Sequence, residues 1–386
     1  MRHESRSRKA SAIIVDMYNR AMAEPADAAR YHRLQLRLAI ARLTLTLAYF
    51  LVVLASGAGH RLAEAAAGIT ISSALRVALV AIALGALHTL LGFPLAWLGG
   101  FHWPRRFGLL HQPLRSWLLD RAKAAALGGV VALAGVEALY ALLRTTPLWW
   151  LGMAALTFAF SIVVSAVLPV WVLPLFYRLT PLGDEALRAR LLALAGQAGV
   201  PAVGVWVADQ SRRSRTANAA VLGLGRTRRI LLYDTLTASF RPEEIEAVLA
   251  HELGHHVHGD MRRGLLLQGA LSLVMFWLTD RALHAGVGVW GLSGPADPAG
   301  LAWLALVAVI LGLVTAPLAN GFSRLLERQA DDFALALTRN PGGFIGAMER
   351  LASLNLAERR PHRLKELVLY SHPALDRRIA RARANF

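Results

Sequence analysis

Residues 247–260, AVLAHELGHHVHGD, bring four histidines and one glutamate together in an otherwise apolar chain. The segment before them, RPEEIE, begins at Arg241 and has a proline and two glutamates near its start. These residue types are favoured in the first turn of a helix, where their shape and charge suit the free N–H groups. Residues 241–260 are therefore predicted to form a single helix that carries the histidines.

Two of these histidines share one face of the predicted helix. His251 and His255 are four residues apart, so both imidazoles can reach one metal ion. Glu252 adjoins His251, where it could take a proton from a water at that ion. This HExxH spacing is typical of zinc sites with a glutamate general base. His256 lies about 100° around the helix from His255, and His258 lies a turn beyond it, so neither is predicted to join the site.

A catalytic zinc site needs a third protein ligand and an open position for water. The segment SRLLERQADDFALAL, residues 323–337, has Glu327 and Asp331 four apart on one helix face. Glu327 is predicted to bind the single zinc ion. Asp331 could accept a hydrogen bond from a ligating imidazole and fix its tautomer. The alternative interpretation is a solvated acidic face of an amphipathic helix, and Asp332 is interpreted as ordinary surface.

The composition indicates a membrane protein. Of the 386 residues 55% are hydrophobic and only 17% are charged, whereas about a quarter are charged in soluble domains. Cysteine is absent, which excludes disulfides and thiolate ligands, and the N-terminus does not have the pattern of a secretory signal. Six segments approach the about 20 apolar residues that a span needs. They are 38–56, 77–99, 124–143, 148–175, 264–283 and 301–320, and Asp280 and Arg281 interrupt the fifth.

The net charge of +17 is distributed as expected for membrane topology. All but three of the 42 basic residues are arginine, and they fall mostly between the apolar segments rather than along one face. Loops on one side hold nearly all of them, which by the positive-inside rule places both termini and the polar segments in the cytoplasm. A nucleic-acid surface is not predicted.

In chain order, several motifs together resemble the type 1 CAAX prenyl protease family of integral-membrane HExxH zinc metalloendopeptidases. The matching segments are LGFPLAWLGGFHWPRRFGLLHQPLRSWLLDRAK, PLFYRLTPLGDEALRARLLALAGQAGVP, SRRSRTANAAVLGLGRTRRILLYDTL, AHELGHH, SRLLERQADDFAL and YSHPALDRRI. They run from about residue 90 to residue 385. The short chain and its arginine-rich composition favour a compact, bacterial-type member.

The resemblance implies roles for the metal-site residues. His251, His255 and Glu327 match the family's zinc ligands, and Glu252 matches its general base. Asp331 matches the carboxylate that supports the ligands from behind. One zinc ion per chain is implied.

The resemblance also implies a substrate site. Asn218 and Ala219 match the pair on an edge strand that aligns a peptide by main-chain hydrogen bonds. His372 matches a histidine that could stabilise the oxyanion, although a histidine before proline could instead cap a turn. Arg378 matches the arginine six residues later. Thr216 stands where eukaryotic members have a histidine, in TANA for HSNA.

The predicted fold is mainly α: a polytopic membrane helical protein of about six spans with a cytoplasmic, gluzincin-like zinc-protease domain containing a small β-sheet. Within that domain, residues 184–199 are predicted as a helix and 203–209, 217–225 and 228–236 as strands, with a hairpin turn at GLGRTRR. The predicted divisions are an N-terminal cytoplasmic segment 1–37, a four-span region 38–178, a first protease part 179–262, a two-span region 263–320 and a second protease part 321–386.

The predicted function is zinc-dependent hydrolysis of peptide bonds in lipidated or membrane-associated substrates, in the inner membrane of a bacterium. The partners are a peptide or protein, prenylated or membrane-bound, and the lipid bilayer, with no nucleic acid. An HtpX-like quality-control endopeptidase is the enzymatic alternative. A transporter would need paired ionisable groups within its spans, and Arg42, Glu137 and Asp280 have no obvious partners. An inactive scaffold would not need Glu252.

Overall fold

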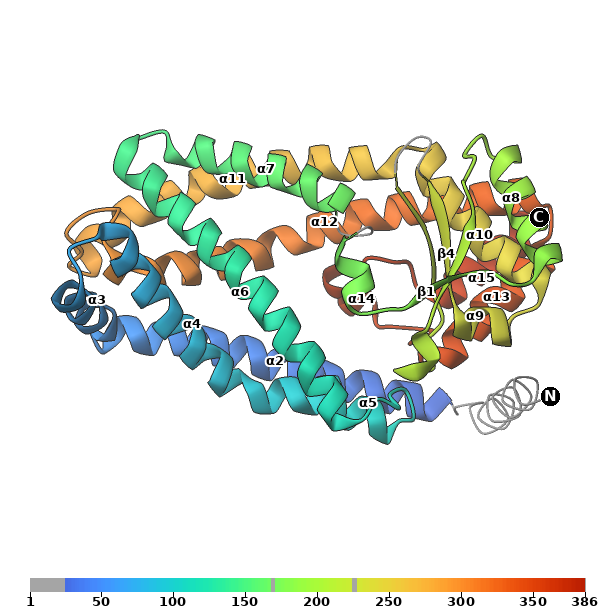
Figure 1. Cartoon of the computed structure of the whole chain (residues 1–386), viewed down its shortest axis with the longest axis horizontal. Helices are drawn as coiled ribbons and strands as arrows, with labels where there is room; N and C mark the ends of the chain where they lie inside the picture. The colour runs from blue at the N-terminus through green and yellow to red at the C-terminus, as the bar shows by residue number, and fades with distance from the viewer. Residues whose placement is uncertain (1–24, 168–170, 224–227, 386) are drawn as a thin grey trace.

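The computed structural model describes residues 25–167, 171–223 and 228–385. The start of the N-terminal segment, residues 168–170 of the fourth predicted span, the end of the predicted strand 217–225 with the turn at 224–227, and residue 386 of the last division lie outside these residues. Long helices form one half of the molecule, and a small sheet with shorter helices forms the other half (Figure 1).

The elongated half consists of long helices joined by short connections. The long helices are α2 (Pro25–Ala55), α3 (Ala58–Ile69), α4 (Ser73–Trp97), α6 (Leu114–Thr145), α7 (Trp149–Val167), α11 (Asp260–Val289) and α12 (Leu301–Thr338). The short segments are the π-helix η1 (Leu98–His102), α5 (Trp103–Arg106) and the 3₁₀ turn η6 (Pro298–Gly300). Because their outer faces carry many exposed apolar side chains, these helices suit a lipid environment.

Four helical segments of the described chain are long and apolar enough to cross a membrane: Asp27–Ala55, Ser73–Arg106, Leu114–Thr145 and Pro298–Thr338. They contain the first, second, third and sixth predicted spans. The fourth prediction corresponds to α7, which is apolar over the shorter stretch Trp149–Ser165. The fifth lies in α11, which is long enough but carries charged residues at its start and at Asp280, so it is not among the four.

The structure gives Asp280 the partners that the sequence did not reveal. Trp149 Nε1 on α7 donates a hydrogen bond to Asp280 Oδ1 at 2.8 Å, and the Arg281 guanidinium pairs with the other carboxylate oxygen. Both Asp280 and Trp149 are buried where α7 packs on α11. This carboxylate therefore has a structural role that explains why a charge interrupts the predicted span.

The second half is built on a four-stranded sheet in the order β1-β2-β4-β3. The strands are β1 (Leu179–Pro181), β2 (Val205–Ala208), β3 (Ala219–Leu222) and β4 (Arg229–Tyr233). β2 and β4 are parallel, whereas β1–β2 and β3–β4 are antiparallel. The predicted strands contain β2, β3 and β4, and β1 was not predicted. β3 lies at one edge of the sheet.

Shorter helices surround this sheet. They are α8 (Glu185–Gln197), α9 (Asp234–Ser239), α10 (Pro242–Val257), α13 (Pro341–Leu354), α14 (Arg363–Leu369) and α15 (Leu375–Asn385), with 3₁₀ turns η3 (Leu173–Leu175) and η4 (Gln210–Arg212). The core packs one face of the sheet against α8, α10 and α13, with Leu191, Ile230, Leu249 and Phe344 fully buried. Apolar burial on this scale holds α10 rigidly in place.

Two helices differ from the prediction in their ends. α10 stops at Val257 because Gly259 adopts φ 67, a left-handed conformation that ends helices, and Asp260 then begins α11. The sixth predicted span and the helix carrying Glu327 are one continuous helix, α12, which runs from the helical half into the sheet domain (Figure 1). α12 therefore connects the membrane region rigidly to the candidate site.

Candidate metal centre

The α10 and α12 helices pack directly against each other at a glycine. A Cβ atom on Gly254 would lie 3.0 Å from the Ala330 Cα and 3.3 Å from the Ala330 carbonyl oxygen. Only glycine leaves room for backbones this close. Gly254 lies inside the HExxH motif, and Ala330 lies between Glu327 and Asp331, so this contact brings the two predicted halves of the site together.

His251, His255 and Glu327 converge at this contact. One ligand atom from each lies within 4.8 Å of the others. His251 Nε2 is 3.3 Å from His255 Nε2 and 3.3 Å from Glu327 Oε2, and His255 Nε2 is 3.6 Å from Glu327 Oε1. His251 and Glu327 are buried, and His255 is half-buried.

The donor set fits a zinc-sized ion. Ligand atoms about 2.0–2.2 Å from zinc in a tetrahedral arrangement lie roughly 3.3–3.6 Å apart. The two Nε2 atoms have this separation, and each lies at a similar distance from one oxygen of Glu327, Oε2 for His251 and Oε1 for His255. Glu327 Oε2 is also buried without a hydrogen-bond partner among the described residues, since its approach to His251 lacks hydrogen-bond geometry. A buried carboxylate oxygen is costly to leave unsatisfied, and a cation at this point would satisfy it.

Each imidazole is held from behind by a carboxylate. His251 Nδ1 lies 2.9 Å from Asp331 Oδ1. His255 Nδ1 lies 2.8 Å from Asp260 Oδ2. Because each Nδ1 donates to a carboxylate, each Nε2 is left with a lone pair directed into the cluster. The sequence prediction included Asp331 but missed Asp260, whose only sequence signal is its position directly after the helix-ending Gly259.

Arg378 on α15 binds Asp331, the carboxylate that holds His251. Its Nε and Nη2 atoms donate to the two oxygens of Asp331 at 2.8 and 2.6 Å. The same Nη2 lies 3.5 Å from His251 Nδ1 and 4.0 Å from Glu327 Oε2. The guanidinium is almost completely buried, and although burial alone lowers its pKa, Asp331 raises it. The positively charged Arg378 guanidinium therefore offsets part of the negative charge of the carboxylates around the histidines.

The electrostatics of the cluster favour a cation. Burial would lower the pKa of His251, but the adjacent carboxylates of Asp331 and Glu327 raise it to about 9. Burial raises the pKa of the neighbouring Glu252 carboxyl, and the nearby His251 and His255 oppose that effect only in part. A carboxylate with a raised pKa beside a cation site holds a proton more readily than an exposed one, as a general base must.

His372 approaches the cluster from the connection between α14 and α15. Its Nε2 lies 3.1 Å from Glu327 Oε1, and its Nδ1 lies 2.9 Å from Ser371 Oγ. The His372 side chain is 59% exposed, in contrast to the buried ligand cluster. The structure thus places this predicted residue at the open side of the site, where it can meet a ligand.

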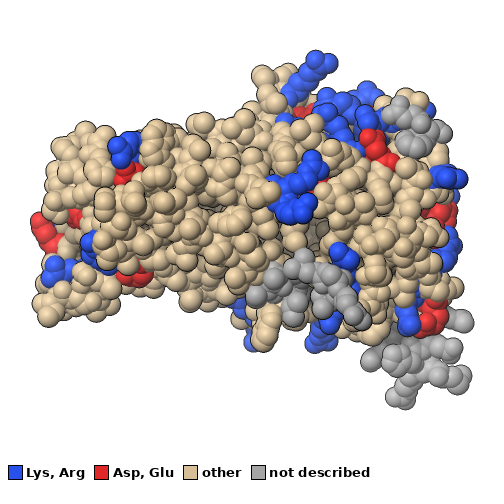
Figure 2. Space-filling model, turned by 90° about the horizontal axis from the view of Figure 1, so that it is seen from above, with Lys and Arg blue, Asp and Glu red and all other residues tan. Residues whose placement is uncertain are grey.

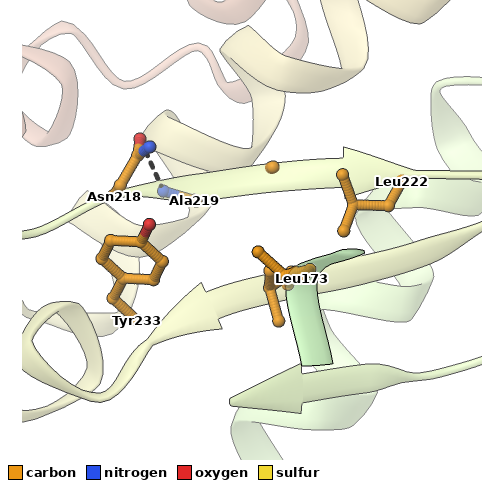
Figure 3. Close-up of a pocket in the computed structure, with 7 residues that line it drawn as sticks. Leu173, Asn218, Ala219, Leu222 and Tyr233 are labelled. Carbon is orange, nitrogen blue, oxygen red and sulfur yellow. Dashed lines mark hydrogen bonds between the residues drawn. The ribbon is translucent and has the colours of Figure 1, made fainter. Parts of the chain in front are cut away.

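Asn218 and Ala219 lie apart from the cluster, at the start of the edge strand β3. The Asn218 side-chain oxygen accepts a hydrogen bond from the Ala219 N–H at 3.0 Å (Figure 3). They line a pocket of about 110 Å³. Its other walls are Leu173, Ala220, Leu222, Leu231 and Tyr233. No hydrogen bond among the described residues joins either of the two to the histidines.

A rigid pair of helices with two histidines and a carboxylate at one point, attached to long apolar helices, defines the class of membrane metalloproteases. The chain belongs to peptidase family M48, whose sequence profile matches residues 181–385. Residues 16–178 match a second profile, described as the CAAX prenyl protease N-terminal region with five membrane helices. The protein is therefore a multi-pass membrane metalloendopeptidase, which uses a metal ion to hydrolyse a peptide or protein substrate.

The relatives agree with this assignment. The chain is 30% identical to the uncharacterized metalloprotease YhfN of Bacillus subtilis over 78% of its own length and 71% of that protein. It is 35% identical to CAAX prenyl protease 1 of Saccharomyces cerevisiae, over 45% of its length and 38% of the yeast protein. It is 32% identical to Protease HtpX of Chromohalobacter salexigens over 48% and 67% of the two chains.

The fold itself resembles a solved structure. The crystal structure of S. mikatae Ste24p superposes with a TM-score of 0.78 at 24% sequence identity, and the match covers 92% of this chain and 87% of that one. The predicted fold class, a helical membrane protein with a protease domain around a small sheet, is confirmed.

Proposed function

We propose that the protein is a zinc-dependent endopeptidase that cleaves lipidated or membrane-associated peptides, in the manner of CAAX prenyl protease 1. The observation that carries this proposal is the convergence of His251, His255 and Glu327 within 4.8 Å, next to Glu252. These three residues are the proposed zinc ligands, one ion per chain. Several relatives named CAAX prenyl protease 1 support the substrate class.

Zinc bound to this set would act as a Lewis acid on the scissile carbonyl and would lower the pKa of a bound water. In the proposed mechanism Glu252 accepts the proton of the attacking water and returns it to the leaving amine. His372, exposed at the open side, donates a hydrogen bond to the oxyanion. Asp331 and Asp260 orient the two imidazoles, and Arg378 holds Asp331 in place.

The substrate main chain is proposed to pair with the edge strand that begins at Asn218 and Ala219, because an unpaired edge can accept an extended peptide. Residues 179–262 and 321–386 would together form the protease domain beside the membrane regions 38–178 and 263–320. Lys and Arg gather around the sheet half on the face in Figure 2, the middle of the helical half is free of charge, and a few charged residues of both signs lie at its far end. By the positive-inside rule, we place the site and both termini in the cytoplasm.

The arginine-rich composition of the chain favours the inner membrane of a bacterium. The basic surface around the sheet half is proposed to face lipid headgroups, not nucleic acid.

A quality-control endopeptidase is the second candidate function. The observation that favours it is the similarity to Protease HtpX over 67% of that protein. Such an enzyme would cleave unfolded membrane proteins without requiring a lipid on the substrate.

One assay distinguishes these functions. Purified full-length protein in detergent with zinc is given a farnesylated CAAX peptide, its unlipidated twin and an unfolded membrane protein, with Glu252→Gln as the inactive control. Cleavage of the farnesylated peptide alone, lost in the variant, would support prenyl-peptide processing. Cleavage of all three without lipid preference would support quality control. Absence of Glu252-dependent cleavage despite bound zinc would refute the endopeptidase assignment for these substrates.

A further inference from the structure

The backbone groups of the edge strand β3 alternate in direction. Tyr233 N–H donates to the Asn218 carbonyl at 3.0 Å, one position before the first antiparallel β3–β4 pair, Ala219 with Leu232. In such a ladder hydrogen-bonded pairs alternate with non-hydrogen-bonded pairs. Ala219 and Val221 occupy the non-hydrogen-bonded positions, opposite Leu232 and Ile230. Their N–H and C=O groups therefore point away from β4, toward the open edge.

Side chains of this protein already occupy half of these outward groups. His256 Nε2 lies 3.0 Å from the Val221 carbonyl oxygen, and because a carbonyl can only accept, Nε2 must carry the proton. The Ala219 N–H donates to Asn218 Oδ1 at 3.0 Å. Among the described residues, nothing hydrogen-bonds the Ala219 C=O or the Val221 N–H.

The strand is also closed before Ala219. Asn355 Oδ1 accepts from the Ala217 N–H at 3.0 Å, and Asn355 Nδ2 donates to the Ala217 C=O at 3.2 Å. This side-chain amide takes the place that a neighbouring strand would otherwise fill. An incoming peptide therefore finds a single short stretch of open edge, between Ala217 and Val221.

We propose that His256 is a positioning residue that fixes the register of the substrate main chain on β3. It does so by withholding the Val221 C=O from the substrate, which leaves the Ala219 C=O and the Val221 N–H as the pair that holds the peptide. This inference rests on the proposed endopeptidase function. It gives a role to a histidine that cannot reach the metal cluster.

The location of His256 explains why register matters. It directly follows His255 on the rigid helix α10, so one helix carries both a proposed metal ligand and the clamp on the edge strand. A peptide that slipped along β3 by two residues would keep its side-chain alternation but move about 7 Å. With the Val221 C=O free, a peptide in this slipped register would gain a hydrogen bond to it. A different peptide bond of the substrate would then lie at the proposed metal ligands.

The bond is not needed to hold the strand in the core. The side chains of Ala219 and Val221 are buried in the apolar cluster beneath the sheet, and β3 is paired along its length with β4. Removing the His256 donor should therefore leave folding and metal binding intact while changing how a peptide lies on the edge.

The test compares His256→Leu and His256→Gln with wild type, all full-length and zinc-loaded. The substrate is a peptide that wild type cleaves, and kcat, KM and the cleavage positions by mass spectrometry are measured. For His256→Leu we expect a second cleavage position two residues from the first, because the freed Val221 C=O can accept from a slipped peptide, and no rise in KM, because the substrate loses no hydrogen bond of its own. His256→Gln, whose amide can donate to the same carbonyl, should restore the single position.

His258→Leu is the matched control, because His258 is a neighbouring histidine with no hydrogen bond to β3 among the described residues. A single cleavage position in His256→Leu, unchanged from wild type, would overturn the proposal, as would loss of bound zinc in that variant. Peptide affinity is also measured with and without His256→Leu in the Glu252→Gln variant. This binding measurement does not depend on turnover. If His256→Leu binds the peptide more weakly than the His256 protein in that background, the proposal fails even where the wild type cleaves none of the peptides, because freeing the Val221 C=O should not weaken binding.

Discussion

Asp260 Oδ2 lies 2.8 Å from His255 Nδ1, on the far side of the left-handed Gly259 that ends α10. The second imidazole therefore has a carboxylate behind it, as the first has Asp331. The two carboxylates come from α11 and α12, the helices that lead into the membrane region. The orientation of both proposed ligands thus depends on helices outside the HExxH segment.

Replacing this carboxylate should weaken metal binding without removing a ligand. For Asp260→Ala we expect zinc affinity to fall about 10- to 100-fold, the usual effect of losing such a support. Asp260→Asn, which keeps an acceptor oxygen but not its charge, should fall between that variant and wild type. Competition with a chelating dye measures the affinity. Asp332→Ala, at a more exposed carboxylate paired with Arg381, is the control and should bind zinc normally. Equal affinities for wild type, Asp260→Ala and Asp260→Asn would contradict this role for Asp260.

The glycine contact between α10 and α12 gives a second prediction. In Gly254→Ala the added methyl group meets the Ala330 backbone at 3.0 Å, so the helices must separate by a few tenths of an ångström. We expect reduced zinc affinity and reduced activity, and near-complete loss of both in Gly254→Val, whose branched side chain needs more room. Zinc content and kcat/KM are the measurements. Gly196→Ala, on α8 where nothing lies near the added atom, should behave as wild type. Normal zinc binding in Gly254→Val would show that the close approach is not required.

The sequence predicted those parts of the site that depend on local helical spacing. His251, His255 and Glu252 follow from a four-residue repeat on one helix, and Glu327 and Asp331 repeat that spacing on another. The structure places these two sets together, but no pattern within either helix specifies their contact at Gly254. From the sequence, the two sets were joined by the need of catalytic zinc for a third ligand and by the resemblance to a known family.

Asp260 shows why the remainder was not predicted. On the continuous helix predicted for residues 241–260, a residue five positions after His255 would point about 140° away from it. The left-handed Gly259 redirects the chain and returns the carboxylate to the imidazole. β1 was missed for a different reason, since three residues are too few to show an alternating pattern. Both depend on tertiary context that a local pattern does not contain.

The pairing of Arg378 with Asp331 leads to a prediction about stability. Both side chains are at most 10% exposed and are joined by two hydrogen bonds. Removing the cation in Arg378→Met leaves a buried carboxylate without its charge partner, which should lower the free energy of unfolding by about 3–5 kcal/mol. Arg381→Met breaks the analogous pair with Asp332 between the same two helices, but that pair is about 40% exposed. Arg381→Met should lower the free energy of unfolding by only about 0–1 kcal/mol.

Denaturant unfolding in one detergent, followed by tryptophan fluorescence, compares the two arginine variants. Both proteins are unfolded without metal, in a chelator, because bound zinc would add any change in its affinity to the free energy of unfolding. Equal losses of stability for Arg378→Met and Arg381→Met would refute the claim that burial distinguishes the two ion pairs.

The start of α10 gives a prediction about pH. Burial raises the pKa of Glu244, but hydrogen bonds from the Arg241 N–H and from the Arg350 and Arg241 guanidinium groups outweigh it and lower the pKa below the ordinary 4.5. A carboxylate with a lowered folded pKa contributes stability above its unfolded pKa and loses it as the pH falls through the folded value. Unfolding free energy should therefore hold down to about pH 5 and decline below about pH 4.5. Glu244→Gln should be less stable at pH 7 and should show a weaker decline on acidification. Parallel profiles for wild type and Glu244→Gln would show that this carboxylate does not link folding to pH.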